Sequence, residues 1–568
     1  MIRLSLVSLV SLLSLSTALG DSATWRVDPL NGDWNLADNW TPATVPDGPT
    51  NAARFQASDI TQISVNSQIE VDRVVFDSGA GAYSFTIEHF QWLILNGKGI
   101  INLSDEMQQF FVLNTAQLRF MNNASAGTNT TVYNRPESGG SEVNYTQFFD
   151  NSTASGGTFI NEGSQDQTTL GASTQFRSES NAGNGVFINL PGINNGLGGT
   201  VLFWDNSNAA NGTFTNHASP SRFAPNTLFF NTSSAGAGSF LNEGASEEGG
   251  DGGGTYFIGS STAGQAVVTS KAGTVSGADG GFVEFDESST AGEATLIALG
   301  GAGNGAKILF FDTSDGGTAR VELFGNGFLD IASHSAGSVR IGSLEGDGPV
   351  LLGANNLTIG SNGMTTTFNG VSSGSGSITK TGEGTLLLSG PNTYEGGTTV
   401  ADGALVVANQ IGSGTGSGPV DVDAGSLGGS GIIAGAVTVG TGSGTGAFLT
   451  PGIGTSKQVT LTTQNALTFN SDATYTYTFK GNRNRVRNDV VIANGVTING
   501  GTIAISSSSQ NRVRRGMVLT VISNTSANPI SGTFSNLPDG AIINVNGNNL
   551  QASYSGGDGN DLTLTVVP

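Results

Sequence analysis

Short runs of apolar residues alternate with Gly, Asn, Ser and Thr along almost the whole chain. No segment keeps apolar residues at the i, i+3, i+4 and i+7 spacing of an amphipathic helix. Val, Ile, Thr and Phe predominate in the runs, and Gly or Asn separates them, which is typical of short strands joined by turns. The pattern predicts an all-β protein.

An aromatic residue recurs at the end of these runs with a regular period. Successive gaps are 29, 27, 28, 26, 27, 28 and 26 residues, which average about 27. The positions are Phe120, Phe149, Phe176, Trp204, Phe230, Phe257, Phe285 and Phe311. A unit of this length cannot bury its own apolar face, so such units must stack. We predict eight stacked coils of an elongated parallel β-helix. A β-propeller is the alternative, but its blades usually need about 40 residues.

About ten residues after four of these aromatics there is a second short apolar segment, which ends in Asn. The four segments are Phe159-Ile160-Asn161, Phe187-Ile188-Asn189, Phe214-Thr215-Asn216 and Phe240-Leu241-Asn242. Stacked coils would place aromatic on aromatic and Asn on Asn at the interstrand distance of about 4.8 Å. We interpret the aromatic rows as core rather than as a sugar-binding platform, and the Asn rows as turn ladders.

The residue pattern of the sequence changes beyond Gly374. Residues 376–390 read GSITKTGEGTLLLSG, 391–400 read PNTYEGGTTV and 401–407 read ADGALVV. This order of Lys, Gly, Leu and Tyr closely resembles the autotransporter-associated β-strand repeat, also called the passenger-associated transport repeat. The resemblance implies a right-handed β-helix and a surface or secreted role, without naming a ligand.

Segments on both sides of this repeat resemble those of secreted proteins that carry it. They suggest a signal peptide at 1–20, an N-terminal capping segment and first coils at 21–117, and the eight-unit region at 118–340. The repeat with its preceding segment then occupies 341–419, and a closing β module occupies 420–568. The Trp-rich start is expected to cap the edge that a solenoid leaves open. The closing module runs to Val566-Val567-Pro568, so we expect no C-terminal translocator barrel and export by other machinery, or retention in the periplasm.

The first twenty residues indicate export. A positively charged start precedes the largely apolar stretch Leu4 to Leu15, and Ala18-Leu19-Gly20 offers small residues for cleavage after Gly20. An uncleaved anchor is the alternative, but the apolar core is short and rich in Ser. The mature chain has no later apolar stretch of spanning length, so we expect it to lack a transmembrane segment.

Composition narrows the possible partners. Charged residues make up 12 % of the chain and the net charge is −22. This disfavours nucleic acid and anionic lipid as partners, because both need a positive face.

Cysteine is absent, which excludes thiol chemistry and a disulfide scaffold. The 30 Phe residues argue against disorder.

Candidate chemistry is sparse. Acids follow the repeat aromatics at Asp150, Asp205, Asp286 and Asp312, and their recurrence suits turn capping better than one catalytic site. The three His residues show no metal-ligand spacing. Residues 556–561 resemble one calcium nonapeptide copy, but a single copy leaves an ion half-coordinated. We therefore expect no catalytic, metal or cofactor site, with a polysaccharide-degrading β-helix enzyme as the alternative.

One basic segment breaks the acidic pattern. Asn-Arg-Val-Arg occurs at 484–487 and again at 511–514, which could bring Arg485, Arg487, Arg512 and Arg514 onto one face. A solvated, charge-protected strand edge is the plain interpretation. The functional hypothesis is docking of an anionic envelope glycan, because Arg pairs bidentately with phosphate and carboxylate.

The sequence as a whole predicts a secreted or cell-surface protein with a structural or adhesive role. Its expected partner is a polysaccharide, matrix or cell-envelope glycan, contacted through an extended surface. The oligomeric state is left open.

Overall fold

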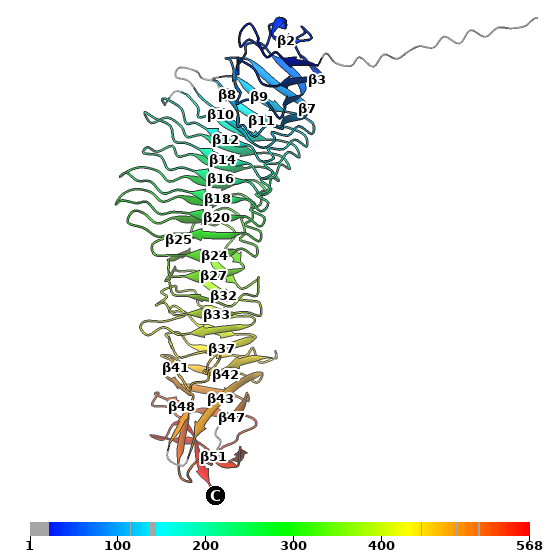
Figure 1. Cartoon of the computed structure of the whole chain (residues 1–568). Coiled ribbons are helices and arrows are strands. Elements are labelled where there is room, and N and C mark those ends of the chain that lie inside the picture. The colour runs from blue at the N-terminus through cyan, green and yellow to red at the C-terminus, as the bar shows by residue number, and fades with distance from the viewer. Residues whose placement is uncertain are drawn as a thin grey trace, which may run out of the picture.

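The structure is a computed structural model that describes residues 22–113, 115–136, 144–167, 169–444, 446–482, 485–508 and 512–568. The predicted signal peptide lies outside the described residues. Parallel strands stack into an elongated, curved β-solenoid of about 18 turns, with coils of roughly 26 residues (Figure 1). The one helix within the described ranges is the short 3-10 helix η1 (Ala37–Asn39). The predicted all-β parallel β-helix is confirmed.

Two long sheets form the main faces of the rod. The first has 16 strands, in the spatial order β2 (Trp40–Thr41), β1 (Ala23–Trp25), β3 (Gly48–Phe55), β5 (Ile69–Phe76), β7 (Trp92–Asn102), β9 (Gln117–Phe120), β11 (Tyr145–Phe148), β13 (Ser173–Phe176), β15 (Thr200–Phe203), β17 (Asn226–Phe229), β19 (Gly254–Phe257), β21 (Phe282–Phe285), β23 (Lys307–Phe310), β25 (Phe328–Asp330), β28 (Val350–Gly353) and β31 (Ser372–Gly374). The second comprises β4 (Gln62–Val65), β6 (Ser84–Ile87), β8 (Gln108–Val112), β10 (Thr130–Asn134), β12 (Thr158–Asn161), β14 (Val186–Asn189), β16 (Thr213–Asn216), β18 (Ser239–Asn242), β20 (Val267–Ser270), β22 (Thr295–Ala298), β24 (Arg320–Leu323), β27 (Ser343–Gly346), β30 (Thr366–Phe368), β33 (Thr385–Leu388), β35 (Ala404–Val407), β37 (Gly425–Gly429), β40 (Ala447–Leu449), β43 (Ala473–Gly481), β44 (Val486–Asn488) and β47 (Thr502–Ser507).

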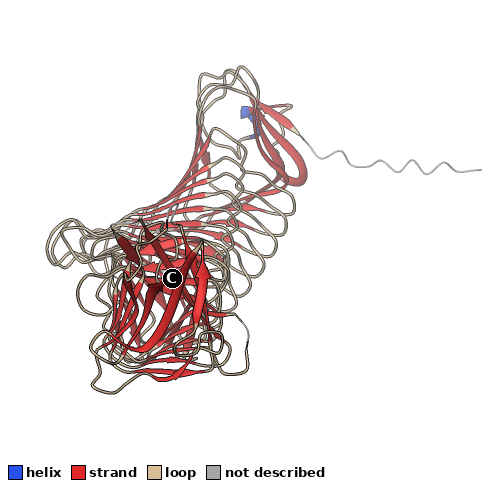
Figure 2. Cartoon of the chain, turned by 90° about the horizontal axis from the view of Figure 1, so that it is seen from below, coloured by secondary structure: helices blue, strands red, loops and turns tan. Residues whose placement is uncertain are grey.

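Two further sheets belong to the C-terminal half. The third has nine strands, namely β26 (Ser338–Ile341), β29 (Asn356–Ile359), β32 (Ser377–Lys380), β34 (Thr398–Val400), β36 (Val420–Val422), β39 (Val437–Val439), β42 (Leu467–Phe469), β46 (Val496–Asn499) and β49 (Ser531–Thr533). The fourth has seven, namely β38 (Ile432–Ile433), β41 (Thr460–Thr463), β45 (Val490–Ala493), β48 (Val518–Asn524), β52 (Asp561–Val567), β51 (Asn548–Gly556) and β50 (Ile542–Val545). Figure 2 looks along the rod from its C-terminal end and shows successive coils overlying one another, with loops at the corners.

The coil shortens along the rod. Tyr145 pairs with Ser173, 28 residues later, whereas Ile378 pairs with Thr398, only 20 residues later. In the long coils a third side is held by single bridges, such as those that join Ser234 to Thr262 and Thr262 to Thr290. The full strands of the third sheet appear only in the shorter coils.

Stacked phenylalanine rings fill the interior of the long coils. The inward residues of the first sheet are Phe120, Phe148, Phe176, Phe203, Phe229, Phe257, Phe285 and Phe310, all fully buried. Neighbouring rings lie 4.5–4.9 Å apart and within 9° of parallel, which matches the strand spacing. A second row from Phe159 to Phe240 meets the first edge to face. The predicted aromatic core is therefore confirmed.

Four of the predicted aromatic positions are displaced by one residue. In these four coils the buried ring belongs to the preceding residue. The predicted residue follows it and is partly exposed, at Phe149, Trp204, Phe230 and Phe311. Each is the second residue of a double aromatic, and successive side chains of a strand point to opposite faces. A one-residue slip in register therefore moves these rings from the core to the outside.

Asparagine side chains form a second buried ladder at the ends of the second-sheet strands. The Asn189 amide donates to Asn216 Oδ1, and the Asn216 amide donates to Asn242 Oδ1, both at 2.8 Å. These residues are fully buried, so the row lines the interior rather than the turns. The ladder also holds the opposite sheet, because Asn216 donates to the Gly254 carbonyl at 2.8 Å and Asn242 to the Phe282 carbonyl at 2.7 Å.

Turn capping explains three of the four recurrent acids. Asp150, Asp205 and Asp312 take the left-handed conformation, with φ of 55°, 59° and 50°. Each carboxylate accepts the backbone N–H of the equivalent turn one coil earlier. The grouping of Asp286 with them is wrong. Glu287 occupies this row with φ of 54°, and Asp286 lies one residue before it, at the position of Phe149 and Trp204.

Tryptophan side chains close the N-terminal end of the core. Trp25, Trp34 and Trp40 are fully buried, and Trp40 packs edge to face against both of the others at 5.0 and 5.1 Å. Phe55 links this cluster to the first complete coil. The cluster covers the end of the core formed by the described residues.

Replacing Asn216 by Ala should strongly destabilise the rod. The change removes the hydrogen bonds that Asn216 accepts from the Asn189 amide and donates to Asn242 Oδ1 and the Gly254 carbonyl, which should cost about 2–4 kcal/mol. Asn211→Ala, at an exposed position of the same coil, should change stability by less than about 0.5 kcal/mol. Chemical denaturation of both variants measures the difference, and equal losses would contradict the role of the ladder.

Candidate functional site

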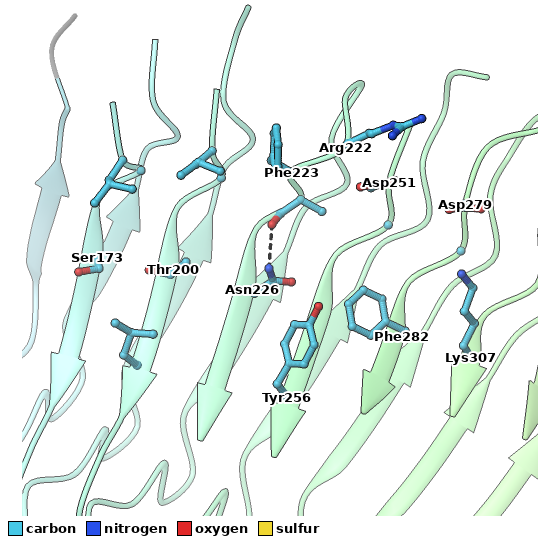
Figure 3. Close-up of a pocket in the computed structure, with 18 of the residues that line it drawn as sticks. Ser173, Thr200, Arg222, Phe223, Asn226, Asp251, Tyr256, Asp279, Phe282 and Lys307 are labelled. Atoms are coloured by element: carbon cyan, nitrogen blue, oxygen red, sulfur yellow. Dashed lines mark hydrogen bonds between the residues drawn. The ribbon is translucent and has the colours of Figure 1, made fainter. Parts of the chain in front are cut away.

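A groove of about 610 Å³ runs along the outer face of the first sheet. Its floor is made of outward-facing residues of strands β11 to β23, and its wall is made of the loops that precede these strands (Figure 3). Seven neighbouring strands give the floor a length of roughly 30 Å at the usual strand spacing. The groove is therefore long and open rather than a closed cavity.

The wall is held rigid by hydrogen bonds from loop to loop. Gly198 donates its N–H to the Phe223 carbonyl at 3.1 Å, and Ala245 donates to the Asp279 carbonyl at 2.8 Å. Ser219 and Asp251 form an antiparallel bridge between the two loops that flank the centre of the groove. Phe223 projects from this wall and is 46 % exposed.

An aromatic pair occupies the middle of the floor. Tyr256 and Phe282 lie on neighbouring strands with ring centroids 5.0 Å apart and planes at 80°. A Cβ atom at Gly254 would lie 2.3 Å from the Phe282 ring, so the ring extends over the backbone of β19. Glycine at 254 therefore provides space for Phe282 rather than an unusual backbone conformation, and the ring can present a face to the groove.

Opposite charges alternate at the C-terminal end of the groove. Arg222 and Asp251 come from the wall, and Lys307 points from the floor toward the loop of Asp279. Burial raises the pKa of Asp251, and nearby Asp279 adds to this, while Lys307 and Arg222 act in the opposite direction. The four charges sum to zero, so this end of the groove offers hydrogen-bond donors and acceptors without a strong net field.

A carboxyl pair lies beside the aromatic floor. Glu284 is in register with Tyr256 on the neighbouring strand, and Asp286 faces the same side two residues later. Burial, and then the charge of Asp286, raise the pKa of Glu284 to about 7. Burial also raises the pKa of Asp286, and burial together with these acids raises that of Tyr256. Part of the Glu284 carboxyl population is therefore protonated near neutral pH.

Two of the four arginines predicted to share one face line a common depression. Arg485 and Arg487 line a shallow depression of about 530 Å³ together with Lys457 and Lys480. Arg512 and Arg514 are exposed on either side of the buried Val513 and do not line the depression. Arg483, which belongs to the same basic segment, lies outside the described residues.

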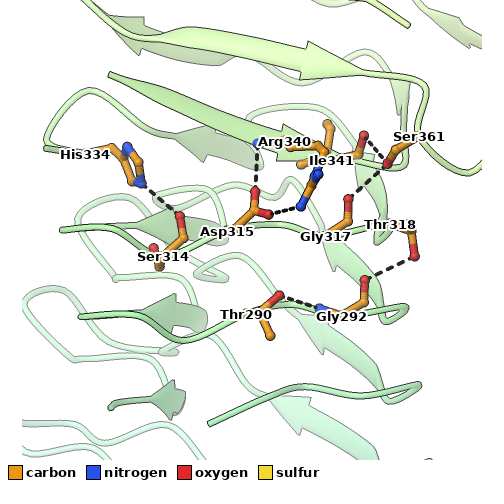
Figure 4. A network of polar contacts seen from close by, with 10 residues as sticks. All are labelled: Thr290, Gly292, Ser314, Asp315, Gly317, Thr318, His334, Arg340, Ile341 and Ser361. Carbon is orange, nitrogen blue, oxygen red and sulfur yellow. Dashed lines mark hydrogen bonds and ion pairs between the residues drawn. The ribbon is translucent and has the colours of Figure 1, made fainter. Parts of the chain in front are cut away.

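A polar network at the end of the long coils is structural. The Arg340 guanidinium donates to Asp315 at 2.7 Å, and the Arg340 backbone N–H donates to the other oxygen at 3.0 Å. His334 contacts the Ser314 carbonyl at 2.8 Å. Figure 4 shows these contacts tying neighbouring coils together. The network joins the last single-bridge coil to the first strand of the third sheet.

In the part of the chain that is described, no group of three His, Asp or Glu side chains is placed to hold an ion. In the tail that resembles a calcium repeat, the Asp561 carboxylate accepts the Asn524 N–H at 2.9 Å. This contact gives the residue a structural role.

The groove is not predicted by the sequence pattern described above. Its signal lies in the residues between the buried positions of the floor strands, where Tyr256, Phe282 and Glu284 follow outward residues that are mostly Gln, Ser, Thr, Leu and Asn. Gly254 stands at a strand position where its neighbours carry side chains. These residues can be recognised as outward-facing only when the inward-facing residue of each strand is known.

The passenger-associated-transport-repeat family matches residues 378–407. The chain contains a passenger-associated-transport repeat. The matched segment comprises most of strand β32 with β33, β34 and β35, so the repeat forms stacked coils that alternate between the third and second sheets. No curated protein matches the chain.

The signature residues of the repeat are structural. Lys380 is 1 % exposed and its ammonium donates to the carbonyls of Thr381 and Gly382, both at 2.7 Å. Burial lowers its pKa to about 8. Tyr394 is fully buried and its hydroxyl lies 2.6 Å from Thr398 Oγ1. The repeat therefore builds coils and presents none of these groups to a ligand.

The repeat points to an extracellular or surface location. Among the described residues there is no helix with the length and apolar character needed for a membrane crossing.

The stability of the rod should respond to the ionisation of Glu284. Because the folded-state pKa is near 7 and the ordinary value is 4.5, the folded chain binds more protons between these values, and stability falls as pH rises through them. Glu284→Gln cannot ionise at this position. The free energy of unfolding of this variant should therefore rise relative to that of the wild type between pH 5 and pH 8. Unfolding at both pH values measures this. Glu383→Gln, at an exposed position, should follow the wild type, and parallel curves for Glu284→Gln would contradict the prediction.

Proposed function

We propose that this protein is an extracellular surface rod that holds a polysaccharide chain in the groove of the first sheet. The observation that carries the proposal is the floor at Tyr256 and Phe282, where aromatic rings lie beside charged groups of both signs in an open channel. Rings that expose a face pack well against the C–H surface of a sugar, and carboxylate, guanidinium and ammonium groups bond its hydroxyls.

The shape of the groove favours a linear chain over a compact ligand. It is open along the rod axis, and its floor crosses seven strands. The balance between Arg222 and Lys307 on one side and Asp251 and Asp279 on the other favours a ligand of low charge. The acidic chain as a whole, with a net charge of −22, disfavours nucleic acid.

The outer aromatic row at Phe149, Trp204 and Phe230 does not support a second platform. Trp204 stacks on Phe230 with centroids 4.0 Å apart, and Arg177 covers Trp204 at 4.9 Å. Because Phe230 and Arg177 cover the faces of Trp204, this ring offers a ligand only its edge. The groove is thus the better site for sugar.

Phe282→Ala and Gly254→Ala should each weaken binding of the full chain to the polysaccharide that it retains. The first removes the ring, and the second displaces it with one methyl group. Losses of about tenfold are expected, equivalent to 1.4 kcal/mol, with little dependence on salt. Co-sedimentation with a panel of insoluble neutral polysaccharides measures this.

Gly79→Ala is the matched control, because a Cβ atom there meets nothing within 4 Å. It should bind as the wild type does. Wild-type retention on no polysaccharide of the panel, or equal losses for all three variants, would refute groove binding.

The carboxyl pair favours a second candidate function, a polysaccharide-degrading enzyme. A Glu with a pKa of about 7 is suited to act as a general acid. In this alternative Glu284 would protonate a leaving oxygen while Asp286 stayed ionised. We favour binding without cleavage, since Glu284 and Asp286 lie beside the groove lining rather than within it.

Prolonged incubation with each retained polysaccharide separates the two functions. Binding alone predicts no new reducing or unsaturated chain ends with either the wild type or Glu284→Gln. Chain ends that the wild type releases and Glu284→Gln does not would replace the binding proposal with the enzymatic one.

A further inference from the structure

We infer that the depression lined by Lys457, Lys480, Arg485 and Arg487 binds the acidic groups of an anionic polysaccharide, at a site separate from the groove. From here on it is called the cationic depression. It lies in the C-terminal module, on the hairpin of β43 and β44 and the loop between β40 and β41.

The hairpin sets the spacing of the cations. Lys480 on β43 is directly opposite Arg487 on β44 in an antiparallel pair. Val486, between Arg485 and Arg487, packs against the core. Because side chains alternate along a strand, this contact turns both arginines outward, and both are exposed. Lys457 completes the depression from the facing loop.

Among the described residues, no carboxylate forms an ion pair with these cations. The acid nearest in sequence, Asp489, is fully buried and turned inward. Its carboxylate accepts the Val459 N–H at 3.0 Å and the Thr478 hydroxyl at 2.6 Å. Within the described residues, no ion pair within 4.0 Å joins the four cations to a carboxylate, although Arg320 and Arg340 elsewhere do form such pairs.

Four like charges around one hollow repel each other and lower the cost of binding an anion. This arrangement is unusual in a chain that has 22 basic and 44 acidic residues. A solvated protective edge would need the charges on the strand but would not need Lys457 to face them from another loop. The convergence from two elements distinguishes a binding site from simple edge protection.

The chemistry identifies the ligand as a chain with spaced acidic groups. Arg485 and Arg487 can each hold a carboxylate or sulfate bidentately, and the two lysines add point charges. Ser456 and Gln458 add a hydroxyl and an amide at the rim for uncharged hydroxyls. A flat anionic membrane would also meet the acidic remainder of the rod, so charge complementarity favours a narrow polymer.

The test uses the full chain with polygalacturonate as the probe and dextran as the uncharged reference. Arg485→Gln/Arg487→Gln should weaken polygalacturonate binding at least about tenfold, since it removes two guanidinium groups that can each form charge-assisted hydrogen bonds with a carboxylate. Arg512→Gln/Arg514→Gln removes the same charge outside the cationic depression and should weaken binding by less than about threefold through the general field. Binding should fall with added salt.

Several outcomes would overturn this inference. They are the absence of polygalacturonate binding by the folded wild type, equal losses in the two double variants, or preferential binding to anionic phospholipid vesicles that only the first double variant loses. Thermal unfolding confirms that both variants are folded. Phe282→Ala should retain polygalacturonate binding, so failure of the groove and failure of the cationic depression are distinguishable.

Discussion

In-register stacking of each coil on the next is the constraint on which this structure depends. A parallel solenoid places every residue about 4.8 Å from its counterpart one coil away. An inward side chain must therefore pack well against the equivalent side chain of the next coil. Phenylalanine meets this demand with parallel rings, and asparagine meets it because its amide can donate to the next and accept from the previous one. The two ladders bury aromatic and polar groups side by side with few unsatisfied atoms.

The same constraint explains where function can reside. Inward rows repeat because a mismatch costs packing or a buried hydrogen bond, whereas outward rows are free to vary. The groove arises where the outward rows vary most, at Gly254, Tyr256, Phe282 and Lys307. The Asn ladder supports this variation from beneath, since Asn216 and Asn242 hold the backbone of the two floor strands. The repeated inward residues thus support outward residues that differ from coil to coil.

The two proposed sites differ in physical character. The groove combines aromatic faces with balanced charges, whereas the cationic depression presents unpaired cations on a hairpin of the closing module. Their ligands should therefore differ in charge and in their sensitivity to salt. The passenger-associated-transport repeat lies between them in the sequence, and its buried Lys380 and Tyr394 give it the role of a spacer that continues the coil.

Periodicity and composition predicted the fold class, the coil length and the aromatic core, and the resemblance of residues 376–407 to a known repeat predicted the segment that matches the repeat family. These are properties that every copy of a repeat shares, so they survive a small error in alignment. Tertiary structure was needed to decide which member of each double aromatic faces inward, because a shift of one residue preserves the period but exchanges the two faces of a strand. It also decided that Asp286 leaves the row of turn acids, that Phe282 extends over Gly254, and that Arg485 and Arg487 join Lys457 while Arg512 and Arg514 do not. Each of these depends on which coil lies beside which, a relation between residues distant in the sequence that local pattern does not carry.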